Sequence, residues 1–166
     1  ILNMQIIIKN KDTLLFDEFK FKCSIGKKGF TSKKFEGDKK TPKGNYTLGP
    51  LYYRADRILN LKSNLKNKKI KKNMGWCDDV NSNLYNKQIN IKKKVKHEKM
   101  FRKDSKYDLL IPINYNCFKI KKNKGSAIFI HLTNDYKKTL GCIAIKKKDM
   151  LILLRLINKK TKIKIS

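Results

Sequence analysis

The first third of the chain alternates apolar and polar residues in short runs, which is the pattern of half-buried β-strands. These runs cover residues 4–9, 13–16 and 19–25. Residues 35–44 are rich in turn formers and predict a loop, after which residues 45–53 predict another extended segment. This part of the chain is therefore predicted to be β-structure.

The last third shows the same pattern with stronger apolar runs. Residues 107–115 and 126–133 predict buried strands, and residues 142–145 and 161–165 predict shorter ones. Only residues 149–157 carry apolar side chains at helical spacing. One helix therefore interrupts a series of strands.

The middle of the chain, residues 60–106, has weak periodicity and many Lys and Asn residues. A structureless loop of this length is unusual, so we expect an excursion with short elements that carries binding surface. Taken together, residues 1–166 predict one mainly β domain, a sandwich or barrel-like fold with one or two short helices. No run of about 18 apolar residues exists, which excludes a spanning helix.

The chain is strongly basic, with a formal net charge of +29 over 166 residues. Of its 42 Lys plus Arg residues, only Arg54, Arg57, Arg102 and Arg155 are arginines. Lys is spread over the whole chain beside abundant Ile and Asn, which indicates a compositional bias of the source proteome. The charge predicts salt-dependent attraction to polyanions and carboxylates, but with so few arginines it predicts no specific nucleic-acid partner.

The four cysteines, Cys23, Cys77, Cys117 and Cys142, show neither C-x-x-C spacing nor a His at metal-ligand spacing, so no metal site is expected. Two disulfides are arithmetically possible, but no spacing favours them. The apolar patch within residues 1–11 is too short for a signal peptide and has no cleavage site. Either an upstream piece is missing or the protein carries no export signal, and a cytoplasmic location stays open.

Candidate chemistry lies in His131, at the end of one predicted strand, and Cys142, at the start of the next. If both reach the same sheet edge, the imidazole can take the proton of the thiol and make it a nucleophile. Gly141 permits close backbone approach, and its N–H, with that of Cys142, is a candidate oxyanion donor. A His or a Cys taken alone is more often an ordinary core residue. His131 and Cys142 together, with Thr139 and Gly141 just before the Cys, indicate catalysis.

These residues resemble the signature of the L,D-transpeptidase catalytic domain, the YkuD-like family. That signature has a His, a variable gap, then Ser or Thr, any residue, Gly and Cys, matched here by His131, Thr139, Gly141 and Cys142. The resemblance runs from about residue 26 to 157. Other segments that resemble the family, mostly one bacterial branch of it, are Thr41-Pro42-Lys43-Gly44, Tyr53-Arg54-Ala55-Asp56-Arg57, Gly75-Trp76-Cys77-Asp78-Asp79, Tyr85-Asn86, His97-Glu98, Phe101-Arg102, Asp104, Tyr107-Asp108 and Gly125-Ser126-Ala127-Ile128-Phe129-Ile130.

The resemblance implies a β-sandwich fold and acyl transfer on peptidoglycan stem peptides. Cys142, as a thiolate, would attack the carbonyl of the third-position diamino acid, and His131, oriented by a backbone carbonyl, would protonate the departing D-residue. An amine would resolve the thioester into a cross-link or exchange the terminal D-amino acid, whereas water would make the protein an L,D-carboxypeptidase. The resemblance implies no metal, no organic cofactor, and a location in the periplasm or cell envelope.

Two positions beside the nucleophile depart from the family pattern. Many members carry His where this chain has Leu140, and Arg or Asn where it has Ala144. Thiol chemistry is still expected, but the fate of the acyl group stays open. A scaffold without turnover, or a non-catalytic basic module that binds an anionic polymer, remains an alternative.

Five further residues are candidates for substrate binding. Arg54, Arg57 and Arg102 are rare arginines in a Lys-rich chain, which makes them candidate clamps for substrate carboxylates. Trp76 and Tyr107 are candidates for the floor of a cleft. The alternatives are structural salt bridges for the arginines and core packing for the aromatic residues.

Overall fold

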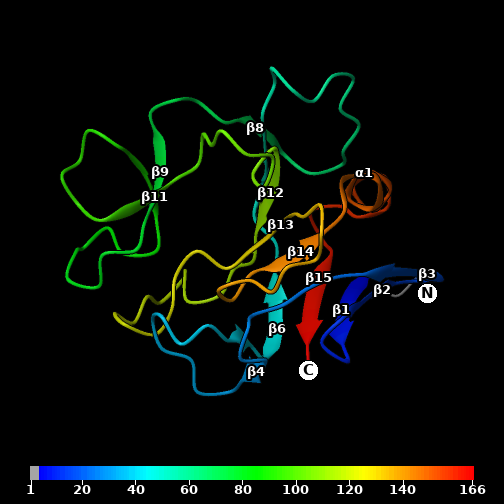
Figure 1. Cartoon of the computed structure of the whole chain (residues 1–166), viewed down its shortest axis with the longest axis horizontal. Helices are drawn as coiled ribbons and strands as arrows, with labels where there is room; N and C mark the ends of the chain where they lie inside the picture. The colour runs from blue at the N-terminus through cyan, green and yellow to red at the C-terminus, as the bar shows by residue number, and fades with distance from the viewer. Residues whose placement is uncertain (1–3) are drawn as a thin grey trace.

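The two ends of the chain meet in one five-stranded sheet (Figure 1). The computed structural model describes residues 4–166, so the first three residues of the predicted N-terminal patch lie outside it. The sheet consists of β1 (Gln5–Lys9), β2 (Thr13–Phe16), β3 (Phe19–Lys22), β6 (Gly44–Thr47) and β15 (Lys162–Ile165). Strand β15 lies between β1, to which it is parallel, and β6, to which it is antiparallel.

A second five-stranded sheet carries the predicted catalytic residues. It consists of β7 (Leu51–Tyr53), β8 (Asn67–Lys69), β12 (Leu109–Pro112), β13 (Phe129–Leu132) and β14 (Ile143–Ile145). The strand order is β14-β13-β12-β7-β8, with β13 and β14 parallel. Every residue of β12 and β13 is buried, because both faces of these central strands are covered, which explains their continuous apolar runs.

The middle of the chain folds into short strands, as its composition predicted. Strands β9 (Met74–Cys77), β10 (Gln88–Asn90) and β11 (His97–Lys99) form a three-stranded sheet with β9 in the centre. In Figure 1 this sheet lies at the opposite side of the molecule from the chain termini. Strands β4 (Phe30–Thr31) and β5 (Thr41–Pro42) form a short parallel pair.

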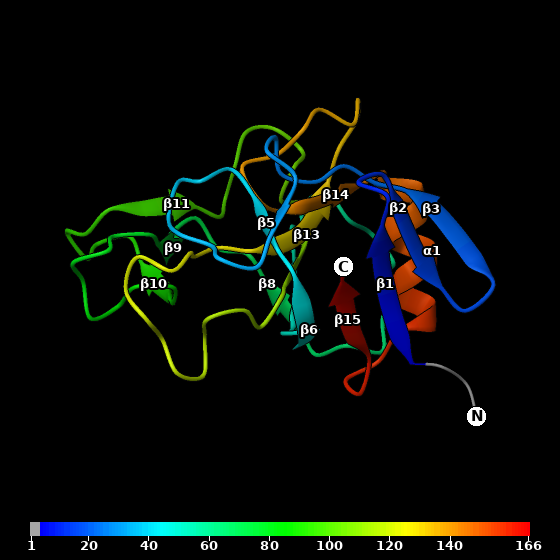
Figure 2. The ribbon, with the colours of Figure 1, turned by 90° about the horizontal axis from the view of Figure 1, so that it is seen from below.

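Two hydrophobic clusters hold these sheets together. The larger joins the two five-stranded sheets and helix α1 (Lys147–Leu156), which buries Met150, Leu153 and Leu154 and lies against β1–β3 in Figure 2. The smaller includes Phe129 and Leu110 on the other face of the second sheet, and Cys142 packs against it. The Cys142 thiol therefore lies at the edge of an apolar cluster.

The mainly β fold with a single helix confirms the predicted fold class. The extended segment 45–53 is not one strand: β6 ends before Gly49-Pro50, and β7 belongs to the other sheet, because Pro50 has no N–H to continue a ladder. The predicted strand 126–133 begins only at Phe129, since Ala127 adopts a left-handed backbone with φ of 52°. Within residues 4–166, no helix has the length and apolar character needed to cross a membrane.

Candidate active site

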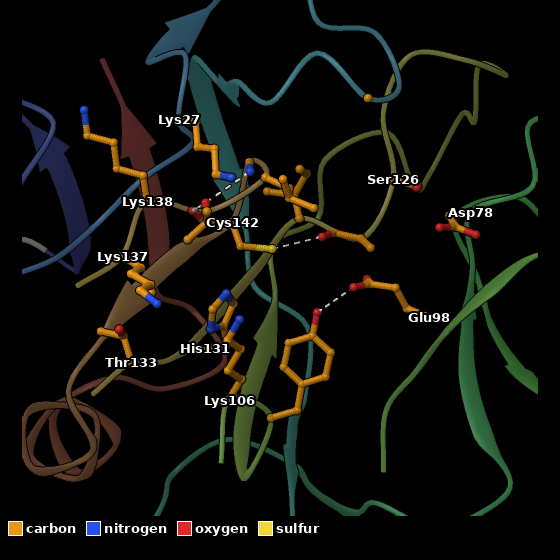
Figure 3. Close-up of a pocket in the computed structure, with 18 of the residues that line it drawn as sticks. Lys27, Asp78, Glu98, Lys106, Ser126, His131, Thr133, Lys137, Lys138 and Cys142 are labelled. Atoms are coloured by element: carbon orange, nitrogen blue, oxygen red, sulfur yellow. Dashed lines mark hydrogen bonds between the residues drawn. The ribbon is translucent and has the colours of Figure 1, made fainter. Parts of the chain in front are cut away.

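Cys142 immediately precedes β14, next to the strand that carries His131. Its thiol donates a hydrogen bond to the Ala127 carbonyl at 3.2 Å and accepts one from the Phe129 N–H at 3.4 Å. Cys142 and His131 both line a pocket of about 1100 Å³, and Figure 3 draws both side chains in it. The parallel pairing of β13 and β14 thus brings together the two residues that the signature singled out.

The imidazole of His131 is oriented by the backbone of the next residue. Its Nδ1 lies 2.9 Å from the carbonyl oxygen of Leu132, and because a carbonyl only accepts, Nδ1 carries the proton. The neutral imidazole then presents an unprotonated Nε2, the form of a general base. Burial lowers the pKa of His131 to about 4. The orienting group is a backbone carbonyl, as the family resemblance implied.

The thiol of Cys142 is protonated in the resting protein. Burial, followed by the negative charge of Glu98, raises the pKa of Cys142 to about 12. With the pKa of His131 at about 4, thiol and imidazole are both neutral near pH 7. This differs from the expected thiolate, because an apolar cluster and a carboxylate oppose the negative charge on sulfur.

The turn before Cys142 is fixed by two threonine hydroxyls. Thr139 Oγ1 donates to the Cys142 carbonyl at 2.6 Å and accepts the Gly141 N–H at 3.1 Å. Thr41 Oγ1 donates to the Gly141 carbonyl at 2.8 Å and accepts the Gly26 N–H at 2.9 Å. Gly141 has φ of 144°, and a Cβ there would lie 2.9 Å from the Lys40 carbonyl oxygen, so glycine is required.

The hydrogen bonds of this turn change the expected oxyanion donor. The Gly141 N–H is already donated to Thr139, whereas the Cys142 N–H has no acceptor among residues 4–166. The candidate oxyanion donor is therefore the N–H of Cys142 rather than that of Gly141.

Arg54 and Arg57 lie outside the pocket lining and bind the protein's own chain. Arg54 is buried, forms a two-pronged pair with Asp56 and donates to the Arg102 carbonyl at 2.6 Å. Arg57 pairs with Asp108 at 2.9 Å and donates to two further backbone carbonyls. Their contacts correspond to the structural alternative, because the loop between β11 and β12 folds over both guanidinium groups.

Trp76 also lies outside the pocket lining. Its indole N–H donates to Asn86 Oδ1 at 2.9 Å, and its ring packs edge-on against Phe129 at 5.0 Å between centroids. Asn86 also accepts the Ala127 N–H at 3.0 Å, so it fixes the backbone beside the thiol. Trp76 is thus a packing residue behind the site.

Arg102 and Tyr107 do line the pocket. The Tyr107 ring packs edge-on against His131 at 5.5 Å, and its hydroxyl donates to Glu98 Oε1 at 2.9 Å. The Arg102 guanidinium lies 5.1 Å from the centroid of the Tyr107 ring and pairs with Asp104. These residues form the wall next to the imidazole.

Several residues of the pocket were not among those that the sequence predicted for the site. Glu98, Asp78 and Lys106 line it, as does the buried Lys34, whose ammonium pairs with Asp38 at 2.6 Å. Glu98 and Asp78 lie in segments that resembled the family, which was the available signal. Within residues 4–166 the four cysteines are unpaired, and no group of three or more His, Cys, Asp or Glu side chains could hold a metal ion.

Comparisons with known proteins identify the family and a similar fold. The family model of the L,D-transpeptidase catalytic domain, YkuD, matches residues 4–165. A solved structure of Bdellovibrio bacteriovorus Bd1075 is similar in fold, with a TM-score of 0.50 and 17% sequence identity. The match covers 97% of this chain and 46% of that chain, so this chain spans about half the length of that protein. No curated protein gives a significant match to the sequence.

Proposed function

The chain belongs to the YkuD family of L,D-transpeptidase catalytic domains, and from this premise we propose that it is a cysteine-dependent L,D-transpeptidase acting on peptidoglycan stem peptides. The observation that carries the proposal is the shared pocket of Cys142 and His131, with Nδ1 of His131 occupied by a carbonyl and Nε2 available. A thiol and a neutral imidazole in this arrangement supply a nucleophile and its base without a cofactor.

The first half of the reaction makes a thioester. As Cys142 Sγ bonds to the carbonyl carbon of the third-position diamino acid, the thiol proton passes to His131 Nε2. The imidazolium then gives that proton to the nitrogen of the terminal D-residue, whose C–N bond breaks. The Cys142 N–H, which has no acceptor among the described residues, donates to the oxyanion.

The second half regenerates the thiol. An amine of another stem peptide attacks the thioester carbon, gives its proton to His131, and forms the new amide as the C–S bond breaks. The sulfur then takes the proton back from the imidazolium. Because the substrate belongs to the cell envelope, we place the protein there when it acts.

The experiment is mass spectrometry of purified tetrapeptide muropeptides incubated with the protein. We expect a thioester adduct on Cys142 and cross-linked dimers, both absent in Cys142→Ala and retained in Cys117→Ala, since Cys117 lies outside the pocket lining. Tripeptides without dimers would indicate a carboxypeptidase instead. Polyanion binding with no adduct would contradict the proposal and support the basic binding module.

A further inference from the structure

The pocket around Cys142 has walls of opposite charge. In Figure 3, Lys27, Lys137 and Lys138 lie on one side of the thiol, and Glu98 and Asp78 on the other. Four of the chain's 13 Asp and Glu residues line this pocket, together with seven Lys and Arg residues, but Glu98 and Asp78 share the wall that faces the three lysines. This pair of carboxylates on one wall offers a place for a positive group of a ligand.

Glu98 is the first of the two carboxylates on this wall. It lies on β11, and its Oε1 accepts the Tyr107 hydroxyl while Oε2 has no hydrogen-bond or ion-pair partner within residues 4–166. Its charge contributes to the raised pKa of Cys142, so the two groups interact through the pocket. Figure 3 shows the Glu98 carboxylate pointing into the pocket, on the side that faces Cys142.

Asp78 supplies a second, independent observation. It directly follows β9 and lines the same pocket, and its Oδ1 is inaccessible to solvent with no hydrogen-bond partner in the described part of the chain. A buried carboxylate oxygen without a donor is uncommon, because it has lost its hydrogen bonds to water and has no protein hydrogen bond to replace them. A positive group that enters the pocket would offset the uncompensated charge of this carboxylate.

We propose that Glu98 and Asp78 bind a primary ammonium group of the stem peptide, an inference that rests on the proposed function. An ammonium offers three N–H donors and a compact positive charge, which fits two carboxylates with unpartnered oxygens. The lysines on the opposite wall suit the carboxylates of the same peptide. The ammonium comes either from the side chain of the acyl donor's diamino acid or from the acyl acceptor.

Binding of peptides to an inactive variant tests whether the ammonium belongs to the acyl donor. Calorimetry compares stem tetrapeptides with a free and an N-acetylated side-chain amine on the Cys142→Ala protein. We expect about tenfold tighter binding of the free amine, from one or two charge-assisted hydrogen bonds, and loss of most of this preference in Glu98→Gln. Glutamine keeps an acceptor for Tyr107, so the wall retains its shape.

The acyl-enzyme, formed in protein that retains Cys142, tests whether the ammonium belongs to the acyl acceptor. The acceptor concentration at which half of the thioester goes to amide rather than to water should rise about tenfold in Glu98→Gln. Asp135→Asn is the matched control, because Asp135 lines the pocket in the loop that carries Lys137 and Lys138. It removes the same charge and should change neither measurement.

The proposal is overturned if Glu98→Gln keeps the preference for the free amine and also the acceptor dependence of the unsubstituted protein. Absence of a thioester with either peptide would count against the proposed function alone. The binding comparison on Cys142→Ala would then still decide the ammonium site, where equal affinities for the free and acetylated peptides refute it. An amine preference lost equally in Asp135→Asn would also refute it, because general charge would then be the cause.

Discussion

Thr41 and Gly141, separated by 100 positions in sequence, are joined by a hydrogen bond in which the threonine hydroxyl donates to the glycine carbonyl at 2.8 Å. The same hydroxyl accepts the Gly26 N–H, so one buried oxygen connects three segments. The Thr-Pro-x-Gly segment thereby fixes the turn that presents Cys142.

Replacing Thr41 with valine keeps the shape of the side chain but removes this connection. It leaves a buried N–H and a buried carbonyl without partners, so we expect a loss of about 2 to 4 kcal/mol in the free energy of unfolding, and slower acylation. Urea unfolding and intact-protein mass measure the two effects. Thr47→Val, at an exposed position of β6, should change stability by less than about 0.5 kcal/mol.

The protonation of His131 makes stability depend on pH. Its pKa is about 4 in the folded protein and about 6.5 when unfolded, so the unfolded chain binds the proton more readily between these values. Stability should therefore be fully present above pH 6.5 and fall by about 3 kcal/mol as the pH drops to 4. Unfolding at several pH values tests this, and His131→Gln should remove most of the dependence. An equal slope in that variant would contradict the assignment.

The raised pKa of Cys142 predicts slow thiol chemistry in the absence of substrate. Alkylation by iodoacetamide should be slow at pH 7 and should increase about tenfold per pH unit up to at least pH 10. Glu98→Gln should accelerate it at every pH below 10, because removing the carboxylate lowers the pKa of the thiol. Peptide mapping separates Cys142 from the half-buried Cys117. A rate that levels off near pH 7 would indicate a thiolate instead.

The buried pair of Lys34 and Asp38 should be essential for the catalytic turn. Burial alone would raise the pKa of Asp38, but hydrogen bonds from the Lys34 ammonium and from two backbone N–H groups lower it overall. Asp38→Asn leaves the buried ammonium without its counter-charge, so we expect a loss of about 3 to 5 kcal/mol in unfolding experiments. Asp135→Asn, which breaks an exposed pair with Lys137, should leave stability unchanged.

The sequence predicted Cys142 and His131 as a catalytic pair because their positions depend on local features. Each lies in or next to an apolar strand, and the spacing between them requires neighbouring strands. It also predicted most strands correctly, since alternation follows from burial of one face. Strands β6 and β7 were predicted as one extended segment, because the change of sheet at Gly49-Pro50 depends on partners that are distant in sequence.

Residue type did not reveal the placement of the arginines. Arg54 and Arg57 were rare and therefore looked functional, but their position under the loop between β11 and β12 follows from tertiary contacts. The role of Glu98 was hidden for the same reason. Its side chain reaches the pocket only because β11 pairs with β9 in the register that places it opposite Trp76.

The hydrogen bond from the Cys142 thiol to the Ala127 carbonyl has a consequence for the lifetime of the protein. Peroxides and mixed disulfides attack the ionised sulfur far more readily than the protonated one. A thiol that stays protonated until a peptide binds should therefore resist oxidation to sulfenic acid. The carbonyl of Ala127, which accepts the thiol hydrogen, would in this way add to the protection that burial of the thiol provides.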